Sequence, residues 1–187
     1  LTRALVSYKE LVGLVNQEID TITSTGGFPI AQYEKVSVLQ IVQEVLAHLD
    51  PRNIEAYVIC LHIDAQMLVW VDRQYLHRIL QNLLNNIFKY VPTQTTIHIE
   101  ARQETPSSPV CLSLQDEGPG IPPEELTHIF EKLVRLKRDI GGPIRGTGLG
   151  LSICKHLIEV MGGHIWVESS GRMGEGSRFS ITLPSLP

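Results

Sequence analysis

The sequence lacks a basic excess, a long apolar run and a paired cysteine motif, and each absence narrows what the chain can be. Its 16 Lys and Arg against 20 Asp and Glu give a net charge of −4, which offers no electrostatic basis for binding nucleic acid. No apolar run approaches the roughly 18 residues that span a membrane. The three cysteines Cys60, Cys111 and Cys154 form no CxxC pair and lie in apolar segments, which predicts buried thiols in a reducing compartment.

The sequence opens on Leu1 instead of methionine, and its first residues do not show the pattern of a signal peptide. We therefore expect a piece of a longer protein and a cytoplasmic location for this piece, while a membrane anchor elsewhere in the parent stays open. With 187 residues, 43% hydrophobic and 19% charged, the chain suits one globular domain with a short appendage.

The first 22 residues carry apolar side chains spaced alternately four and three apart, the heptad rhythm of a helix that packs on other helices. These are Leu1, Leu5, Tyr8, Val12, Val15, Ile19 and Ile22. The alternative is one amphipathic helix folded onto the domain, since Gly13 weakens the pattern. The stretch STGGF at 24–28 predicts a linker, so we expect a helical stub over 1–25 and the main domain over 26–187.

The remainder interleaves strands and helices without strict alternation. β-branched and aromatic runs predict strands at 57–63, 68–70, 96–101, 110–115, 165–168 and 178–183. Apolar periodicity predicts helices at 38–49, 73–91, 123–136 and 149–161, the first two capped by Ser37 and Asp72. In the first helix we expect Leu39, Val42, Val45 and Leu46 to face inward; in the second, Leu76, Ile79, Leu80, Leu83, Leu84 and Ile87. The fold class predicted is α+β, a two-layer α/β sandwich with one mixed sheet packed on helices.

Three glycines, Gly146, Gly148 and Gly150, frame the start of the last predicted helix. A helix N-terminus attracts phosphate through unpaired N–H groups, and glycine lets an anion approach the backbone closely; Thr147 adds a hydroxyl donor. A plain tight turn is the alternative. No Lys stands where a Walker loop requires it, and Leu151 replaces the third glycine of a dinucleotide fingerprint.

A second glycine cluster, QDEGPGIP at 115–122, follows a predicted strand. Asp116 would end that strand, where its carboxylate can accept a hydrogen bond from an exocyclic amine such as that of adenine. Gly118 and Gly120 would let a flat group lie against the backbone. The alternative is an ordinary Asx turn.

A third group lies in QNLLNNIFKY at 81–90, where Asn82 and Asn86 share one face of a helix and Lys89 follows. Amide oxygens can bind Mg²⁺, and ammonium groups can hold phosphate oxygens. A solvated polar stripe is the alternative for this group taken alone.

The order of these groups is more specific than any one of them. Their order resembles that of the catalytic and ATP-binding domain of two-component sensor histidine kinases: N-L-L-x-N-x-x-K-Y, then D-x-G-x-G-I, then I-F-E, then G-T-G-L-G-L. That domain belongs to the GHKL superfamily, with its Bergerat-type ATP-binding fold, shared with DNA gyrase, heat-shock chaperone and mismatch-repair ATPases. The resemblance covers about 28–183 and includes the closing GGHIWVES and GEGSRFSITLP.

The resemblance implies a role for each matched residue. Asp116 would bind the adenine amine, with Gly118, Gly120 and Ile121 shaping the base pocket. Asn86 would be the Mg²⁺ ligand, and Asn82, Lys89 and Tyr90 would approach the phosphates or ribose; Asn82, Asn86 and Lys89 are the catalytic candidates. The triphosphate would be lined by Gly146, Thr147, Gly148, Leu149, Gly150 and Leu151. The segment 131–145 resembles the family's mobile ATP lid, in which Arg135 is the best candidate for a functional contact.

The resemblance further implies the reaction and its partners. The superfamily's ATPases place a glutamate general base where this chain has Asn82, so we expect phosphoryl transfer rather than rapid hydrolysis. The acceptor would be a histidine on an upstream dimerisation hairpin, absent from this chain, whose second helix ends in the stub. The parent would be a homodimer that relays phosphate to the aspartate of a response-regulator receiver domain. No His lies in 1–22, and the seven present are expected not to be acceptors: His48, His62, His77, His98, His128, His156 and His164.

Two positions depart from the family's pattern. Ile87 stands where the family usually has Ala and could deform the pocket; Leu133 replaces an aromatic and could change how the lid docks. These departures leave open a nucleotide-gated pseudokinase or interaction module of the same fold. A true ATPase and a serine-kinase anti-sigma factor are further alternatives, disfavoured by Asn82 and by the apolar stub.

Overall fold

The computed structural model describes residues 30–136 and 147–187. The chain divides into two compact units, 1–31 and 32–187, and the fold below is that of the second. The predicted heptad helix, the linker at 24–28 and the boundary between 25 and 26 lie outside the described residues, as does most of the predicted lid.

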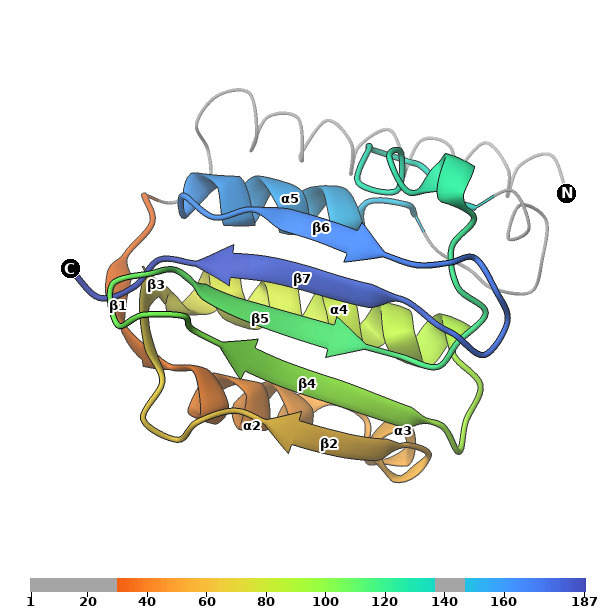
Figure 1. Cartoon of the computed structure of the whole chain (residues 1–187), viewed down its shortest axis with the longest axis horizontal. Coiled ribbons are helices and arrows are strands. Elements are labelled where there is room, and N and C mark those ends of the chain that lie inside the picture. The colour runs from red at the N-terminus through yellow and green to blue at the C-terminus, as the bar shows by residue number, and fades with distance from the viewer. Residues whose placement is uncertain (1–29, 137–146) are drawn as a thin grey trace, which may run out of the picture. The chain divides into compact units, whose positions relative to one another are not determined.

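A five-stranded mixed sheet forms one layer of the domain (Figure 1). Its strands, in spatial order, are β2 (Val58–His62), β4 (Thr96–Arg102), β5 (Val110–Gln115), β7 (Arg178–Leu183) and β6 (Ile165–Glu168). Only β2 and β4 run parallel; every other neighbouring pair in this sheet is antiparallel. The six-residue register of β5 with β7 brings the end of β5, at Gln115, opposite the start of β7, at Arg178.

A second, two-stranded sheet was not expected from the sequence. β1 (Tyr33–Ser37) pairs antiparallel with β3 (Leu68–Asp72). The predicted sandwich of a mixed sheet packed on helices is confirmed, but the expectation that it holds one sheet alone is wrong. The sequence of β1, YEKVS, carries little apolar signal, and in the structure only Val36 of its five residues is buried. The Trp70 N–H donates to the Pro184 carbonyl at 3.0 Å, which ties this small sheet to the segment after β7.

Three longer helices, α2 (Val38–His48), α4 (Arg73–Tyr90) and α5 (Gly150–Val160), form the second layer against one face of the large sheet (Figure 1). Both predicted N-caps are confirmed: the Ser37 hydroxyl accepts from the Gln40 N–H, and the Asp72 carboxylate from the Tyr75 N–H. The buried face of α4 contains all six apolar residues predicted for it, plus Tyr75. A short helix, α3 (Pro51–Glu55), capped by Asp50, was not predicted. No helix within the described residues is long and apolar enough to cross a membrane.

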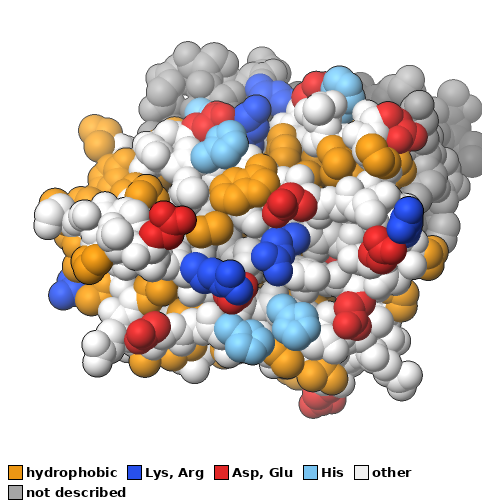
Figure 2. Space-filling model, in the orientation of Figure 1, with side chains coloured by type: hydrophobic (Ala, Val, Ile, Leu, Met, Phe, Trp, Pro, Cys, Tyr) orange, Lys and Arg blue, Asp and Glu red, His pale blue; other side chains and the backbone are white. Residues whose placement is uncertain are grey.

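The opposite face of the large sheet carries polar and charged side chains, which Figure 2 shows between apolar ones. On β4, Ile97, Ile99 and Ala101 are buried while the alternate residues are half-buried or exposed. The rings of His98 and His62 stack on this face with centroids 5.9 Å apart. The sheet therefore has one face for the core and one for solvent.

Several sequence-based expectations need correction. The helix predicted at 123–136 is a 3₁₀ turn, η1 (Pro123–Glu125), followed by turns; Leu133 has φ 64°, which no right-handed helix accommodates. In α2 the buried residues are Val38, Ile41, Val42 and Val45, so Leu39 and Leu46 are half-buried instead.

The prediction of three buried thiols is also wrong in part. Cys154 on α5 is buried, but Cys60 and Cys111 are only half-buried. Cys60 pairs in register with His98, and Cys111 alternates with the buried Val110 and Leu112, so both lie on the face of the sheet away from the helices.

Candidate functional site

A pocket of about 240 Å³ opens where the end of α4, the loop after β5 and the start of α5 meet. Among the predicted site residues, those that line it are Asn86, Lys89, Tyr90, Asp116, Gly120, Ile121, Arg135, Thr147, Gly148, Gly150 and Leu151. Other lining residues are Ile87, Val91, Pro119, Ile129, Val134, Leu136, Ser177 and Phe179. Asn82, Gly118 and Leu149 do not line it, and Gly146 lies outside the described residues.

Asp116 directly follows β5 and is nearly buried, with 5% of its surface exposed. Its N–H donates to the Ser177 carbonyl at 3.0 Å, which fixes the backbone, and its Oδ1 accepts from the Gly118 N–H at 2.7 Å. Burial raises the pKa of Asp116, and hydrogen bonds with the Gly118 and Ser177 backbone oppose that rise. The Asx turn considered as an alternative is therefore present, and the same carboxylate also reaches the pocket, where it can accept a hydrogen bond from a ligand.

The C-terminal half of α4 supplies the polar wall of the pocket. Asn86 and Lys89 lie about one helical turn apart, and Lys89 Nζ donates to the Tyr90 hydroxyl at 3.1 Å. Ile87, the bulkier residue noted from the sequence, is 2% exposed and contributes apolar surface to the same pocket. An amide, a cation and a phenol are thus presented together next to an apolar patch.

Asn82 lies one turn earlier on α4 and faces α5 instead of the pocket lining. A β carbon at Gly150 would lie 3.9 Å from the Asn82 carboxamide. The Asn82 side chain also forms a hydrogen bond with the Cys154 thiol. Burial raises the pKa of that thiol to about 12, although the Asn82 hydrogen bond lowers it. The structure therefore places Asn82 beside the first turn of α5, and its role toward a ligand stays a prediction.

The N-terminus of α5 forms the other end of the pocket, through Gly150 and Leu151 of its first turn. Leu149 occupies the N-cap, and in the described part of the chain no side chain caps this helix. N–H groups at an uncapped helix start lack an intrahelical partner and carry the positive end of the helix dipole. This end of the pocket is therefore suited to an anion.

Glycine is needed at position 148 for a structural reason that the sequence did not reveal. Its φ is 73°, and a β carbon there would come within 2.7 Å of the Leu133 carbonyl carbon and the Val134 oxygen. The Leu133 N–H donates to the Gly148 carbonyl at 3.1 Å. The backbone of Leu133 and Val134 thus packs directly against Gly148, whereas a β carbon at Gly150 would have ordinary room.

Sequence reasoning missed the residues that back Asp116. Ser177 lines the pocket, and Gly176 packs so closely that a β carbon there would overlap the Asp116 carbonyl oxygen. The available signal was the GEGS stretch directly before a predicted strand. Its place beside Asp116 follows from the pairing of β5 with β7, which a single sequence does not display.

Comparisons with known proteins agree with this geometry. Residues 71–187 match the family described as histidine kinase-, DNA gyrase B- and HSP90-like ATPase. Adaptive-response sensory kinase SasA of Synechococcus elongatus (strain ATCC 33912 / PCC 7942 / FACHB-805) is 42% identical over 116 residues, which are 62% of this chain. The match is 29% of that relative's length, so the chain spans under a third of it.

Solved structures share the fold. The mycobacterial sensor histidine kinase MprB superposes with a TM-score of 0.69 at 26% identity, over 83% of this chain and 99% of that one. Histidine kinase ThkA, solved in complex with the response regulator protein TrrA, gives a TM-score of 0.70 at 22% identity, over 96% of this chain and 49% of that one; at that identity the likeness shows the fold alone. Since the family match covers more than half of its residues, the chain belongs to the family of histidine kinase-, DNA gyrase B- and HSP90-like ATPases.

Proposed function

We propose that this chain is the ATP-binding catalytic domain of a sensor histidine kinase. In the reaction, the bond between the γ-phosphorus and the β–γ bridging oxygen of ATP breaks as the phosphorus bonds to an imidazole nitrogen, and ADP leaves. The observation that carries the proposal is one pocket with a nearly buried carboxylate, Asp116, and an uncapped helix start at Gly150. Family membership and the sensory kinase SasA support the same assignment.

The base would bind at the Asp116 end. One carboxylate oxygen already accepts from Gly118, which leaves lone pairs for the exocyclic amine of adenine. Ile121 and Ile87 supply apolar surface for a flat ring, and both are nearly buried. A nucleotide base without an amine at this place would leave the buried Asp116 carboxylate short of a hydrogen-bond donor, so such bases should bind more weakly.

The triphosphate would extend toward α5, with the N–H groups of Gly150 and Leu151 and the Lys89 ammonium neutralising its charge. The donor set fits a hard cation, because the Asn86 carboxamide lies in the pocket wall and Mg²⁺ takes few protein oxygens when phosphates supply others. We propose Asn86 as that ligand. When bound, Mg²⁺ would withdraw charge from the phosphate oxygens.

Transfer to a protein acceptor is favoured over hydrolysis by the amide at position 82, because a carboxamide cannot act as a general base at neutral pH. The acceptor proposed is a histidine on a helical hairpin, and the onward recipient is the aspartate of a response regulator. SasA is named a sensory kinase, and ThkA was solved with a response regulator, which supports the relay as a proposal for this chain.

The proposal is tested in two steps. Calorimetry should detect ATP binding that strengthens with Mg²⁺; Asn86→Ala should reduce this Mg²⁺ effect, while Asn85→Ala, on the exposed side of the same helix, should not. Then γ-labelled ATP should transfer label to a supplied phospho-acceptor hairpin in an acid-labile, alkali-stable form. Absence of ATP binding would contradict the whole assignment, and binding without labelling of any hairpin would remove the kinase part.

A further inference from the structure

The loop between β6 and β7, Ser169–Ser177, lies directly behind the base end of the pocket. The Gly118 carbonyl accepts from two N–H groups of this loop, those of Gly174 at 3.0 Å and Gly176 at 3.2 Å. Within this fully described loop, Ser177 alone lines the pocket. The other residues of the loop do not line the pocket and can act on a ligand only indirectly, through neighbours such as Ser177 and the segment Asp116–Pro122, which we name the base loop.

Ser169 makes the most direct connection between the two loops. Its hydroxyl accepts from the Ile121 N–H at 2.9 Å and donates to the Gly176 carbonyl at 2.7 Å. The Ser177 hydroxyl lies 3.4 Å from the Ser169 hydroxyl oxygen, near the outer limit for a hydrogen bond. Ile121 forms pocket wall, and Gly176 packs on the backbone of Asp116. One half-buried hydroxyl thus joins both walls between which the base would lie.

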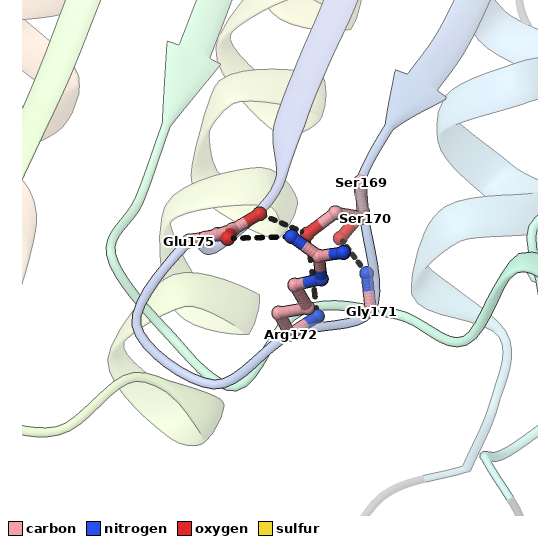
Figure 3. Close-up of polar contacts among 5 residues, drawn as sticks. All are labelled: Ser169, Ser170, Gly171, Arg172 and Glu175. Atoms are coloured by element: carbon pink, nitrogen blue, oxygen red, sulfur yellow. Dashed lines mark hydrogen bonds and ion pairs between the residues drawn. The ribbon is translucent and has the colours of Figure 1, made fainter.

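Figure 3 shows the contacts of the outer part of the loop, whose one drawn link to Ser169 is a long hydrogen bond from the Gly171 N–H to the Ser169 hydroxyl at 3.4 Å. Ser170 Oγ donates to a Glu175 carboxylate oxygen at 2.5 Å and accepts from the Arg172 N–H at 3.3 Å. Arg172 and Glu175 also form an ion pair at 3.5 Å, with side chains 78% and 53% exposed, so its net contribution is small. These contacts stay within the loop, and none reaches the base loop. Ser170 therefore offers a matched control for Ser169.

We propose that Ser169 is a positioning residue for nucleotide binding: its hydroxyl holds Ile121 and the Gly176–Asp116 contact at the spacing that the base requires. This inference rests on the proposed function of the pocket. Removing the hydroxyl leaves the Ile121 N–H and the Gly176 carbonyl without this partner, and the two walls lose their shared link. The phosphate end, built by α4 and α5, has no contact with Ser169 among the described hydrogen bonds.

The test compares Ser169→Ala with Ser170→Ala and Ser169→Thr, using calorimetry with Mg²⁺ and ATP. We expect Ser169→Ala to weaken ATP binding about tenfold, the change that the loss of one buried hydrogen bond causes. Ser170→Ala and Ser169→Thr should stay within about twofold, because the first leaves the link intact and the second keeps a hydroxyl. Inorganic tripolyphosphate, which engages only the phosphate end, should bind Ser169→Ala and the unmodified chain equally well.

A second measurement needs no variant. If Ser169 couples to the ligand, reciprocity requires that ATP slow hydrogen exchange at the Ile121 amide, whereas the Arg172 amide in the outer loop should change little. Equal ATP affinity for Ser169→Ala and the unmodified chain, an equal loss in Ser170→Ala, or unchanged exchange at Ile121 would each overturn the inference. An unmodified chain that fails to bind ATP would instead overturn the proposed function and this inference with it.

Discussion

Gly176 lies against the carbonyl group of Asp116 so closely that a β carbon at position 176 would overlap the carbonyl oxygen. Its φ of 65° adds a second requirement for glycine, because side chains are strained in that region. The contact fixes the backbone of the residue whose carboxylate faces the pocket. Gly176 is therefore a structural condition for the shape of the pocket, although it does not line the pocket itself.

Gly176→Ala should lower the free energy of unfolding by about 3 kcal/mol, the sum of backbone strain and a forced shift of Asp116. ATP binding should fall below detection by calorimetry. Gly174→Ala is the matched control: its φ is 85°, yet no atom lies within 4 Å of the added carbon, so only the strain of about 1–2 kcal/mol applies and ATP binding should persist. Equal losses of binding in both variants would show that the contact with Asp116 is not what matters.

The raised pKa of Asp116 predicts an unusual dependence of stability on pH. From the ordinary value of 3.8 up to its raised value, the folded chain holds a proton that the unfolded chain has released, so the contribution of Asp116 to stability falls as pH rises through this window. Asp116→Asn removes the titration and keeps an oxygen for the Gly118 N–H. We expect the variant to be at least as stable as the parent at about pH 7, measured by urea unfolding.

The same substitution should weaken ATP binding by about 10- to 100-fold, because it removes a charge-assisted hydrogen bond to the adenine amine. A stability gain combined with an affinity loss would show that the buried charge of Asp116 is kept for binding. The interpretation fails if Asp116→Asn binds ATP normally, or if the parent becomes relatively more stable as pH rises through the window.

Leu133 adopts a left-handed backbone conformation, φ 64°, while 49% of its side chain is exposed. That conformation costs a leucine about 1–2 kcal/mol, and asparagine tolerates it better. Leu133→Asn should therefore raise the free energy of unfolding by about 0.5–1 kcal/mol in urea titrations. Met173→Asn is the control, since Met173 is exposed but has no positive φ, and it should bring no gain. Destabilisation by Leu133→Asn would mean that the side chain makes a contact worth more than the strain.

The elements that the sequence predicted well are those with local signals. α4 combines a capping aspartate, an apolar stripe of helical period and a proline after its end, and each is readable without tertiary information. The helix predicted at 123–136 had similar periodicity, but the backbone turns left-handed at Leu133, where it bonds to Gly148 across the chain. β1 escaped notice because its pairing with β3, more than its composition, makes it a strand.

The residues of the pocket likewise fall into two groups, those with a local sequence signal and those placed by long-range strand pairing. Asp116, Asn86 and Lys89 lie in stretches whose spacing already indicated chemistry, and all line the pocket. Gly176 and Ser177 contact Asp116, which is far from both of them in sequence, and only the register of β5 with β7 brings the three residues together. Long-range register is set by the whole sheet, so a local pattern could not have assigned their role.

Asn82 provides a test of where the phosphates lie. It sits beside Gly150 on the first turn of α5, whereas Asn85 on the same helix is exposed. Asn82→Asp would place a negative charge next to the proposed triphosphate and should weaken ATP binding about tenfold at low salt and less at high salt. Asn85→Asp changes the net charge equally and should have an effect within about twofold. If both variants bind ATP alike, a role of the α5 N-terminus in holding phosphate is contradicted, because a charge beside it would then be no worse than a charge in solvent.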